Sequence, residues 1–278
     1  MKLSIVTITY NNKLGLQKTI DNILSQTYSD FEWIVIDGGS TDGSVELLKS
    51  YQSHFDYWCS EPDRGVYNAQ NKGISKATAA YVCCMNAGDV FVDSNTLNSA
   101  MQQKFEADIV YGDWIRNAPS GREYKKAPSV MTKMFLFTDN VCHQSMFVKT
   151  ELLKNNGFDE SMKIFADWKK WREFILAGAT FQYLNMPICL YDTGGLSDTP
   201  SMQNSFERKL LHDAIPSELL NEVEEHEKVV NELWNFKSNT FLKDTYTLIY
   251  DKPLYCHFIK LNLQFLKMLK RIVDKLGV

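Results

Sequence analysis

The sequence lacks the features that would place the chain across a membrane or on nucleic acid. No apolar run reaches the roughly 18 residues needed to cross a bilayer, and the apolar run at the start is too short for a signal peptide. Basic residues are not in excess, because the formal charge is −4 at pH 7. We therefore expect no nucleic-acid partner, and a cytoplasmic protein that is at most bound to the inner face of the cell membrane.

Common metal and cofactor motifs are missing as well. The six cysteines form no Cys-x-x-Cys pair and no cluster with zinc spacing, which favours buried thiols in a reducing compartment. The turn TYNNKLGLQ (9–17) carries no Gly-x-Gly-x-x-Gly, and no Gly-x-x-x-x-Gly-Lys-Ser/Thr occurs anywhere. A Rossmann dehydrogenase is therefore disfavoured, and P-loop phosphoryl transfer is excluded.

What the chain does show is an alternation of strand and helix patterns. The run LSIVTITY (3–10) is apolar and β-branched, as in a buried strand, and apolar residues at helical spacing follow it up to Leu24. The same succession recurs in three segments: FEWIVID (31–37), YWCSEPD (57–63) and AAYVCCMNAGD (79–89). This alternation predicts an α/β fold with a mainly parallel, Rossmann-like sheet and flanking helices.

A polar residue closes each of these strand-like segments, at equal spacing along the chain. These residues are Asn11, Asp37, Asp63 and Asp89. Because the carboxyl ends of parallel strands share one edge, and ligands bind outside that edge, we expect the four side chains to gather around a ligand. Three carboxylates would repel one another there unless a cation or the donor groups of a ligand intervene.

The second half of the chain continues the pattern less regularly. DIVYGDWIR (108–116) is typical of a strand, 116–129 of a polar loop and TFQYLNMPICLYD (180–192) of another strand. A helix is expected from about Trp168 to Ala177, with Asp167 as its N-cap and Gly178 past its end.

The composition changes from Pro216 onward. An amphipathic helix is expected from Ser217 onward, and the tail 252–278 is basic with an apolar face. The tail could lie on an anionic membrane surface or pack on the protein with its lysines in water, and amphipathicity alone does not separate the two. We expect a domain at 1–205, with halves 1–115 and 116–205, and a helical appendage at 206–278.

Asp89 is a candidate ligand for a divalent metal ion. Mg²⁺ usually takes one or two protein carboxylates and completes its shell with water and substrate phosphate oxygens. Such an ion stabilises the charge on a departing diphosphate. The alternative is that Asn86–Asp89 is an ordinary tight turn, since Asn, Gly and Asp all favour turns.

Six segments, in their order, carry a family resemblance over roughly residues 2–200. They are TITYNN, IDGGSTDGS, SEPDRGVYNAQNKGI, MNAGD, FADWKKWREFILAG and TGGLS. Together they resemble the family 2 glycosyltransferases, which use nucleotide-diphosphate sugars on a GT-A fold, and within them the non-processive, bacterial surface-polysaccharide type. Processive members carry Gln-x-x-Arg-Trp after the catalytic base and several membrane spans, and this chain shows neither, so one sugar per encounter is expected.

The resemblance implies the donor contacts. The residues implied to bind the nucleotide sugar are Thr9, Tyr10, Asn11, Asp37, Asp63, Arg64, Asn71, Asn86, Ala87 and Gly88. Asp37 would accept a hydrogen bond from the base, or it could instead brace the GGSTDGS turn. Arg64 would face the phosphates, or it could form a surface ion pair with Asp63 or Glu61.

The resemblance also implies the metal and the base. Asn86–Asp89 falls where the family carries its Asp-x-Asp metal motif, but Asn86 replaces the first acid, so Mg²⁺ or Mn²⁺ should rest on Asp89 and the diphosphate. Asp167 matches the family's catalytic base, although a helix N-cap is a second explanation. An ionised aspartate that removes the acceptor proton in concert with attack implies inversion at the anomeric carbon.

Three further residues are candidates for contact with the acceptor or the diphosphate: His143, Gln144 and Gly195. A lone histidine is also at home in a core or on a surface, and Gly195 could belong to a simple turn. We expect an inverting, metal-dependent transferase that moves one hexose-type sugar, most simply from a UDP-sugar, to a glycan or lipid-linked acceptor. The alternative is a non-catalytic nucleotide-sugar-binding or scaffold protein that retains the fold.

Overall fold

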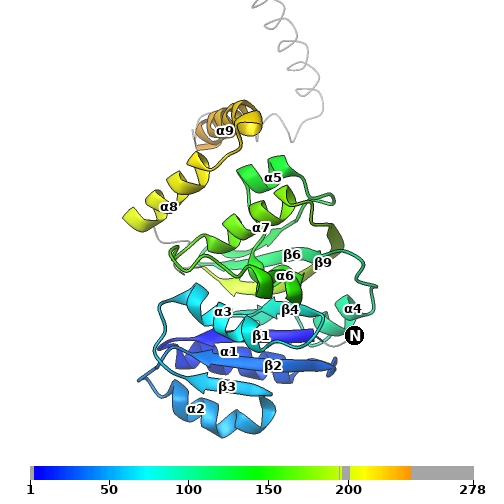
Figure 1. Cartoon of the computed structure of the whole chain (residues 1–278), viewed down its shortest axis with the longest axis vertical. Coiled ribbons are helices and arrows are strands. Elements are labelled where there is room, and N and C mark those ends of the chain that lie inside the picture. Colours follow the sequence, from blue (N-terminus) through cyan, green and yellow to red (C-terminus); the bar gives the residue numbers. More distant parts are fainter. Residues whose placement is uncertain (1–2, 194, 196–200, 239–278) are drawn as a thin grey trace, which may run out of the picture. The chain divides into compact units, whose positions relative to one another are not determined.

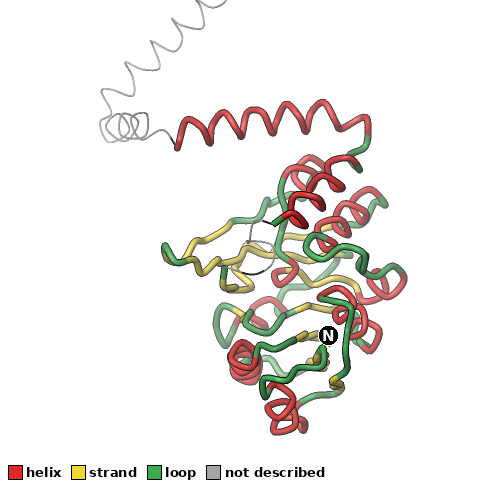
Figure 2. The backbone as a smooth tube through the Cα atoms, turned by 90° about the vertical axis from the view of Figure 1, so that its left-hand side faces the viewer, coloured by secondary structure: helices red, strands yellow, loops and turns green. Residues whose placement is uncertain are grey.

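A computed structural model describes residues 3–193, 195 and 201–238 of the chain (Figures 1 and 2). The strands are β1 Leu3–Thr9, β2 Phe31–Asp37, β3 Tyr57–Ser60, β4 Tyr81–Cys84, β5 Val90–Phe91, β6 Ile109–Ala118, β7 Gly121–Lys125, β8 Met146–Lys149 and β9 Phe181–Asp192. The α-helices are α1 Lys13–Leu24, α2 Ser44–Tyr51, α3 Val66–Lys76, α4 Thr96–Met101, α5 Lys133–Thr138, α6 Thr150–Asn155, α7 Ala166–Leu176, α8 Met202–Asp213 and α9 Ser217–Ser238. Two short 3₁₀ helices, η1 Gln52–His54 and η2 His143–Ser145, complete the described elements.

The strands of the described chain form one mixed sheet. Its order is β3-β2-β1-β4-β8-β6-β9-β5, and β7 pairs with β6 outside this path. β1, β2, β3 and β4 are parallel, as the alternating pattern predicts, while β8 runs antiparallel to both β4 and β6. The predicted α/β class with a mainly parallel sheet is therefore confirmed, and the ends of β1 to β4 share one edge.

Alternation along the strands builds an apolar core on each face of this sheet. Leu3 and Ile5 of β1 pack in the core that contains apolar residues of α1, α2 and α4, whereas Val6 and Ile8 pack in the core that contains those of α3, α6 and α7. Successive side chains of a strand point to opposite faces, so a strand covered on both sides has both sets of side chains buried. All seven residues of β1 are buried, four of them apolar and three of them small hydroxyl residues.

The segment 116–129 is not the polar loop that its composition suggested. Its middle forms β7, which pairs antiparallel with β6 from Trp114 opposite Lys125 to Ala118 opposite Gly121. Gly121 has a φ of +120°, which glycine adopts without strain at this turn. β7 escapes a search for apolar strands because its sequence GREYK is polar and none of its residues is fully buried.

The predicted helix at 168–177 begins earlier than expected. α7 starts at Ala166 with Phe165 as its N-cap residue, so Asp167 lies inside the first turn and is not the N-cap. The predicted domain boundary at residue 205 falls within α8, whereas the chain divides into two compact units between Ser217 and Glu218. α8 therefore belongs with the sheet, because its Leu211 is part of the core that contains α7.

The appended helix expected after Pro216 is present as α9. The basic tail 252–278 lies outside the described residues, so its proposed membrane contact stays a prediction. Within the described ranges, no helix combines the length and the apolar character that crossing a membrane requires.

Candidate active site

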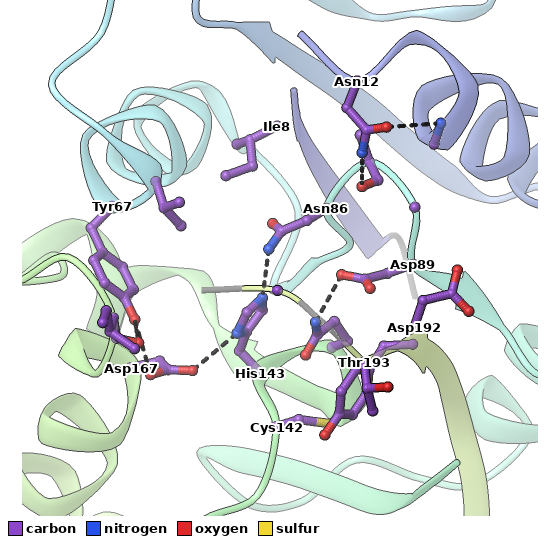
Figure 3. Close-up of a pocket in the computed structure, with 18 of the residues that line it drawn as sticks. Ile8, Asn12, Tyr67, Asn86, Asp89, Cys142, His143, Asp167, Asp192 and Thr193 are labelled. Carbon is purple, nitrogen blue, oxygen red and sulfur yellow. Dashed lines mark hydrogen bonds and ion pairs between the residues drawn. The ribbon is translucent and has the colours of Figure 1, made fainter. Parts of the chain in front are cut away.

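A cleft of about 1230 Å³ opens at the carboxyl ends of β1 and β4 (Figure 3). The predicted site residues that line it are Thr9, Tyr10, Asp63, Asn86, Ala87, Gly88, Asp89, His143, Gln144, Asp167 and Gly195. The strand ends of the first half of the chain and the residues of η2 and α7 in the second half thus meet in one cavity. Four predicted residues, namely Asn11, Asp37, Arg64 and Asn71, are not among those that line it.

Asp37 braces the turn after β2, which is the alternative that its sequence context left open. The side chain is fully buried, and its Oδ2 accepts hydrogen bonds from the backbone N–H groups of Gly39 (3.1 Å) and Ser40 (2.9 Å) and from the Ser60 hydroxyl (2.6 Å). Its Oδ1 accepts one from the Ser40 hydroxyl at 2.5 Å. Asn11 has a similar bracing position, because its Oδ1 accepts a hydrogen bond from the backbone N–H of Thr41.

Arg64 and Asn71 are engaged by the loop at 157–160. The Arg64 guanidinium pairs with Glu160 and is largely exposed, while the Asn71 side chain donates to the Phe158 carbonyl (2.9 Å) and to Glu160 (3.1 Å). An ion pair of Arg64 was one expectation from the sequence, but with Asp63 or Glu61 as its partner. The observed partner is distant in sequence, so composition could not have identified it.

Three groups contact the Asp167 carboxylate in the cleft. Its Oδ1 accepts a hydrogen bond from the backbone N–H of Trp168 (2.8 Å) and lies 3.1 Å from the Tyr67 hydroxyl, whose single proton is shared with the Ile164 carbonyl oxygen at 2.6 Å. Its Oδ2 lies 3.0 Å from His143 Nδ1. Burial and the neighbouring carboxylate raise the pKa of Tyr67 well above its ordinary value, so this hydroxyl remains a donor. A carboxylate offers about four acceptor positions, which leaves one on Oδ2 for a substrate hydroxyl.

Glu207 of α8 fixes the segment that carries Asp167. Its fully buried carboxylate accepts hydrogen bonds from three successive backbone N–H groups, those of Lys163 (2.6 Å), Ile164 (3.0 Å) and Phe165 (3.0 Å). Hydrogen bonds from backbone N–H groups to a charged acceptor are stronger than those to a neutral one. The entry into α7, and with it the position of Asp167, therefore depends on a residue that no sequence pattern singles out.

We expect Glu207→Gln to destabilise the protein by about 1–3 kcal/mol, because the amide nitrogen cannot accept the backbone hydrogen bonds. Urea unfolding followed by circular dichroism measures this loss. Glu46→Gln is the matched control, since Glu46 is exposed, and it should change the unfolding free energy by less than about 0.5 kcal/mol. Equal stability of the two variants would contradict the bracing of α7 by Glu207.

Asp89 lies at the other end of the cleft and carries the second acid of the site. Its Oδ2 accepts a hydrogen bond from Gln144 Nε2 at 2.7 Å. Burial raises the pKa of Asp89 to about 6, and the nearby Asp192 adds to this, whereas Gln144 and Lys18 oppose it. His143 and Gln144 are consecutive residues of η2, and each contacts one of the two acids, His143 with Asp167 and Gln144 with Asp89.

The structure adds site residues that the sequence patterns did not single out. Tyr67 lines the cleft, and Gln70 donates a hydrogen bond to Asn86. The two lie one turn apart on α3 inside the segment VYNAQNKGI, and this helical spacing is the signal that could have placed them on the same face. Lys18 and Asp192 form an ion pair at 2.7 Å and both line the cleft. No local signal marks this second pair, because its members come from α1 and the end of β9.

Comparison with known proteins identifies the family of the chain. A protein-family model described as glycosyl transferase family 2 matches residues 4–165. A PGL/p-HBAD biosynthesis glycosyltransferase of Mycobacterium bovis is 28% identical over 205 residues, which span 70% of this chain and 79% of the mycobacterial protein.

Solved structures share the fold. One is Staphylococcus aureus TarS 1–349 in complex with UDP, with a TM-score of 0.61 at 17% identity over 90% of this chain and 78% of that one. Another is the mannosyltransferase PcManGT of Pyrobaculum calidifontis in complex with GDP-Man and Mn²⁺, with a TM-score of 0.54 at 18% identity over 98% of this chain and 87% of that one. With the family model matching more than half of its length, and the strand-end cleft in place, the chain belongs to glycosyl transferase family 2 and has a GT-A-like fold.

Proposed function

We propose that this protein is an inverting glycosyltransferase that transfers one sugar from a nucleotide-diphosphate sugar, with a UDP-sugar as the best-supported donor, to a hydroxyl of a glycan or lipid-linked acceptor. The observation that carries the proposal is the position of Asp167. One acceptor position of its carboxylate is left open, and it lines the same cleft as Asp89 and the strand-end residues. A base on one side of the reacting carbon and a diphosphate site on the other suit a single displacement.

The donor half of the cleft offers suitable contacts for a nucleotide sugar. Thr9 Oγ1 is buried without a hydrogen-bond partner in the described structure and lines the cleft, so a ligand could satisfy it. Tyr10 is 64% exposed at the same edge, where its ring could cover a base. The TarS complex with UDP supports UDP as the nucleotide. The GDP-Man complex of the mannosyltransferase is the reason for including a GDP-sugar in the donor screen below.

The residues present fit a divalent metal ion that arrives with the diphosphate. Within the described ranges, no group of three His, Cys, Asp or Glu side chains could hold an ion without a ligand. Asp89 offers one carboxylate, and Gln144 donates a hydrogen bond to its Oδ2 only, so Oδ1 is available to a metal ion. One carboxylate plus phosphate oxygens suits Mg²⁺ or Mn²⁺, and a bound ion would supply Lewis-acid stabilisation of the leaving diphosphate.

Asp167 would act as the general base of the reaction. Its Oδ2 accepts a hydrogen bond from the acceptor hydroxyl and takes that proton as the oxygen attacks the anomeric carbon. The bond from the anomeric carbon to the diphosphate breaks on the opposite side, so the configuration inverts and no covalent enzyme intermediate forms. Tyr67, Trp168 and His143 hold the carboxylate during this step.

A donor screen tests the proposal. The purified protein is incubated with UDP-glucose, UDP-galactose, UDP-GlcNAc, GDP-mannose or a dTDP-sugar, with millimolar Mn²⁺ or with EDTA, and the released nucleotide is measured. We expect release from at least one UDP-sugar with Mn²⁺ and at least about tenfold less with EDTA. Calorimetry with UDP, GDP and dTDP under the same two conditions reports which nucleobase the protein prefers, independently of turnover.

Two outcomes would contradict the proposal. Donor binding that is indifferent to EDTA, without turnover for any sugar or acceptor extract, would favour a non-catalytic nucleotide-sugar-binding protein. Transfer with retained anomeric configuration, determined by NMR of the product, would exclude the single displacement at Asp167.

A further inference from the structure

A continuous hydrogen-bond network joins Asp167 to Asn86, in the segment where the family usually carries its metal-binding acidic residues. His143 lies between them (Figure 3): its Nδ1 is 3.0 Å from Asp167 Oδ2, and its Nε2 is 3.1 Å from Asn86 Nδ2. Gln70 donates to Asn86 Oδ1 at 3.1 Å and lies 3.4 Å from the same His143 nitrogen. The imidazole is largely buried, with 13% of its side chain exposed, so these contacts determine its orientation.

The carboxylate of Asp167 can only accept a hydrogen bond, so His143 Nδ1 must carry a proton. This holds whether the imidazole is neutral or charged. The two states differ at Nε2, which accepts a hydrogen bond in the neutral ring and donates one in the imidazolium. Burial lowers the pKa of His143, but Asp167, Asp89 and Cys142 together outweigh burial and raise this pKa.

An amide at position 86 can serve both of these states, and a carboxylate cannot. Asn86 Nδ2 donates to a neutral Nε2, and a half-turn of the amide lets Asn86 Oδ1 accept from the protonated ring. Gln70 Oε1 is buried without a partner in the orientation shown. The same half-turn of both amides would let Gln70 Oε1 accept from Asn86, and Gln70 Nε2 would then take the position that has no partner.

We propose that His143 is the positioning residue for Asp167, donating Nδ1–H to its Oδ2, and that Asn86 supports this donor through its contact with Nε2. The inference rests on the proposed function, because it concerns the orientation of the base. It explains why an amide stands where the family has an acid: position 86 supports the base through His143, and the metal is left to Asp89. The orientation directs the remaining acceptor position of Oδ2 toward the incoming hydroxyl.

Two substitutions of His143 distinguish the role of Nδ1 from that of Nε2. In His143→Asn the amide nitrogen lies near the position of Nδ1 and can still donate to Asp167, whereas in His143→Gln it lies near Nε2 and cannot. We expect kcat to fall by less than about tenfold in the first variant and by at least about 100-fold in the second, since a small misplacement of a base has effects of this size. UDP affinity in Mn²⁺, measured by calorimetry, should stay within about threefold of the wild type in both variants.

A purely structural histidine would give another pattern. It would reduce kcat and the melting temperature in parallel in the two variants, and equal kcat values in them would overturn the proposal. Asn86→Asp adds a second comparison, because a carboxylate at 86 can pair only with the imidazolium. We expect it to lower kcat at least about fivefold, because a His143 imidazolium next to Asp167 makes that carboxylate a weaker base. A gain in kcat would show that position 86 serves the metal alone.

The wild-type protein offers a test that does not depend on turnover. Long-range ¹H–¹⁵N NMR distinguishes the two neutral tautomers of histidine, and the His143 signal is assigned by its absence from the spectrum of His143→Asn. We expect a proton on Nδ1 at every pH at which the ring is neutral. A bare Nδ1 would overturn the proposal even if the enzyme transfers sugar. If no donor turns over, the proposed function fails while this measurement still decides the His143 geometry.

Discussion

Asp167→Asn is expected to lower kcat by about 10²–10⁴-fold, the contribution of a positioned general base. The amide oxygen can still accept the hydrogen bond from the backbone N–H of Trp168, while the amide nitrogen replaces Oδ2 opposite His143 Nδ1, so the hydrogen bond from His143 is lost as well. The amide cannot take up the proton of the acceptor hydroxyl, and attack must then proceed without a base. Initial rates of nucleotide release with a saturating acceptor give kcat, and calorimetry with UDP and Mn²⁺ gives the donor affinity, which should change by less than about threefold.

Asp21→Asn is the matched control for this substitution. Asp21 is an exposed aspartate on α1 that accepts a hydrogen bond from the Gln17 side chain, and it does not line the cleft. Its variant should keep wild-type kcat. If Asp167→Asn kept more than about a tenth of the activity, another group would have to be the base.

Asp89→Asn is expected to abolish metal-stimulated turnover and, at the same time, to make the folded protein more stable at neutral pH. Burial raises the pKa of Asp89 to about 6 in the folded protein, above the ordinary value of an aspartate. The folded state therefore binds this proton more tightly than the unfolded state does. Stability falls as the pH rises from about 4 through 6, and above 6 the full penalty of the buried charge is present.

Removing the charge relieves that penalty. We expect a gain of roughly 1–2 kcal/mol at pH 7.5, which is less than the whole shift would give because the residue is partly accessible to solvent. At pH 4 the gain should disappear, since Asp89 is then protonated in the folded wild type. Asparagine keeps an oxygen that accepts from Gln144, so the contact at 2.7 Å can persist.

Urea unfolding at the two pH values, together with turnover in Mn²⁺, checks both parts of this expectation. Asp21→Asn again serves as the control and should show no pH-dependent gain. A variant that is less stable than the wild type at pH 7.5 would mean that the Asp89 carboxylate is favourably solvated in the fold. A variant that keeps metal-stimulated turnover would mean that Asp89 does not hold the ion.

Much of the site could be expected from the sequence because parallel strands bring their carboxyl ends together. Asp63 and Asp89 are predicted by this argument and Asp167 by the family resemblance, and all three line the cleft. Asp37 and Asn11 are predicted by the same argument, yet they brace turns, because residues that end strands can serve the loop as well as the ligand. Which of the two applies depends on the direction of the side chain, and strand position does not determine it.

The edge strand β7 and the bracing helix α8 show a second limit of sequence patterns. β7 lies at the side of the sheet and has no buried face to impose an apolar alternation. Glu207 of α8 is a charged residue in an ordinary polar helix, and only its contacts with the backbone before α7 reveal that it is fully buried. Neither feature leaves a local signal in the chain.

By itself the sequence determined the α/β class, the succession of β1 to α3 and the strand-end edge, because local alternation and helical spacing follow directly from which residues are apolar. The family followed from the resemblance of six ordered segments. Only the tertiary structure decided how the site residues serve one another. His143 meets Asp167 across 24 residues and Asn86 across 57, while Glu207 holds Lys163 across 44. Hydrogen bonds over such separations form only after the sheet has brought the segments together, so no local pattern encodes them.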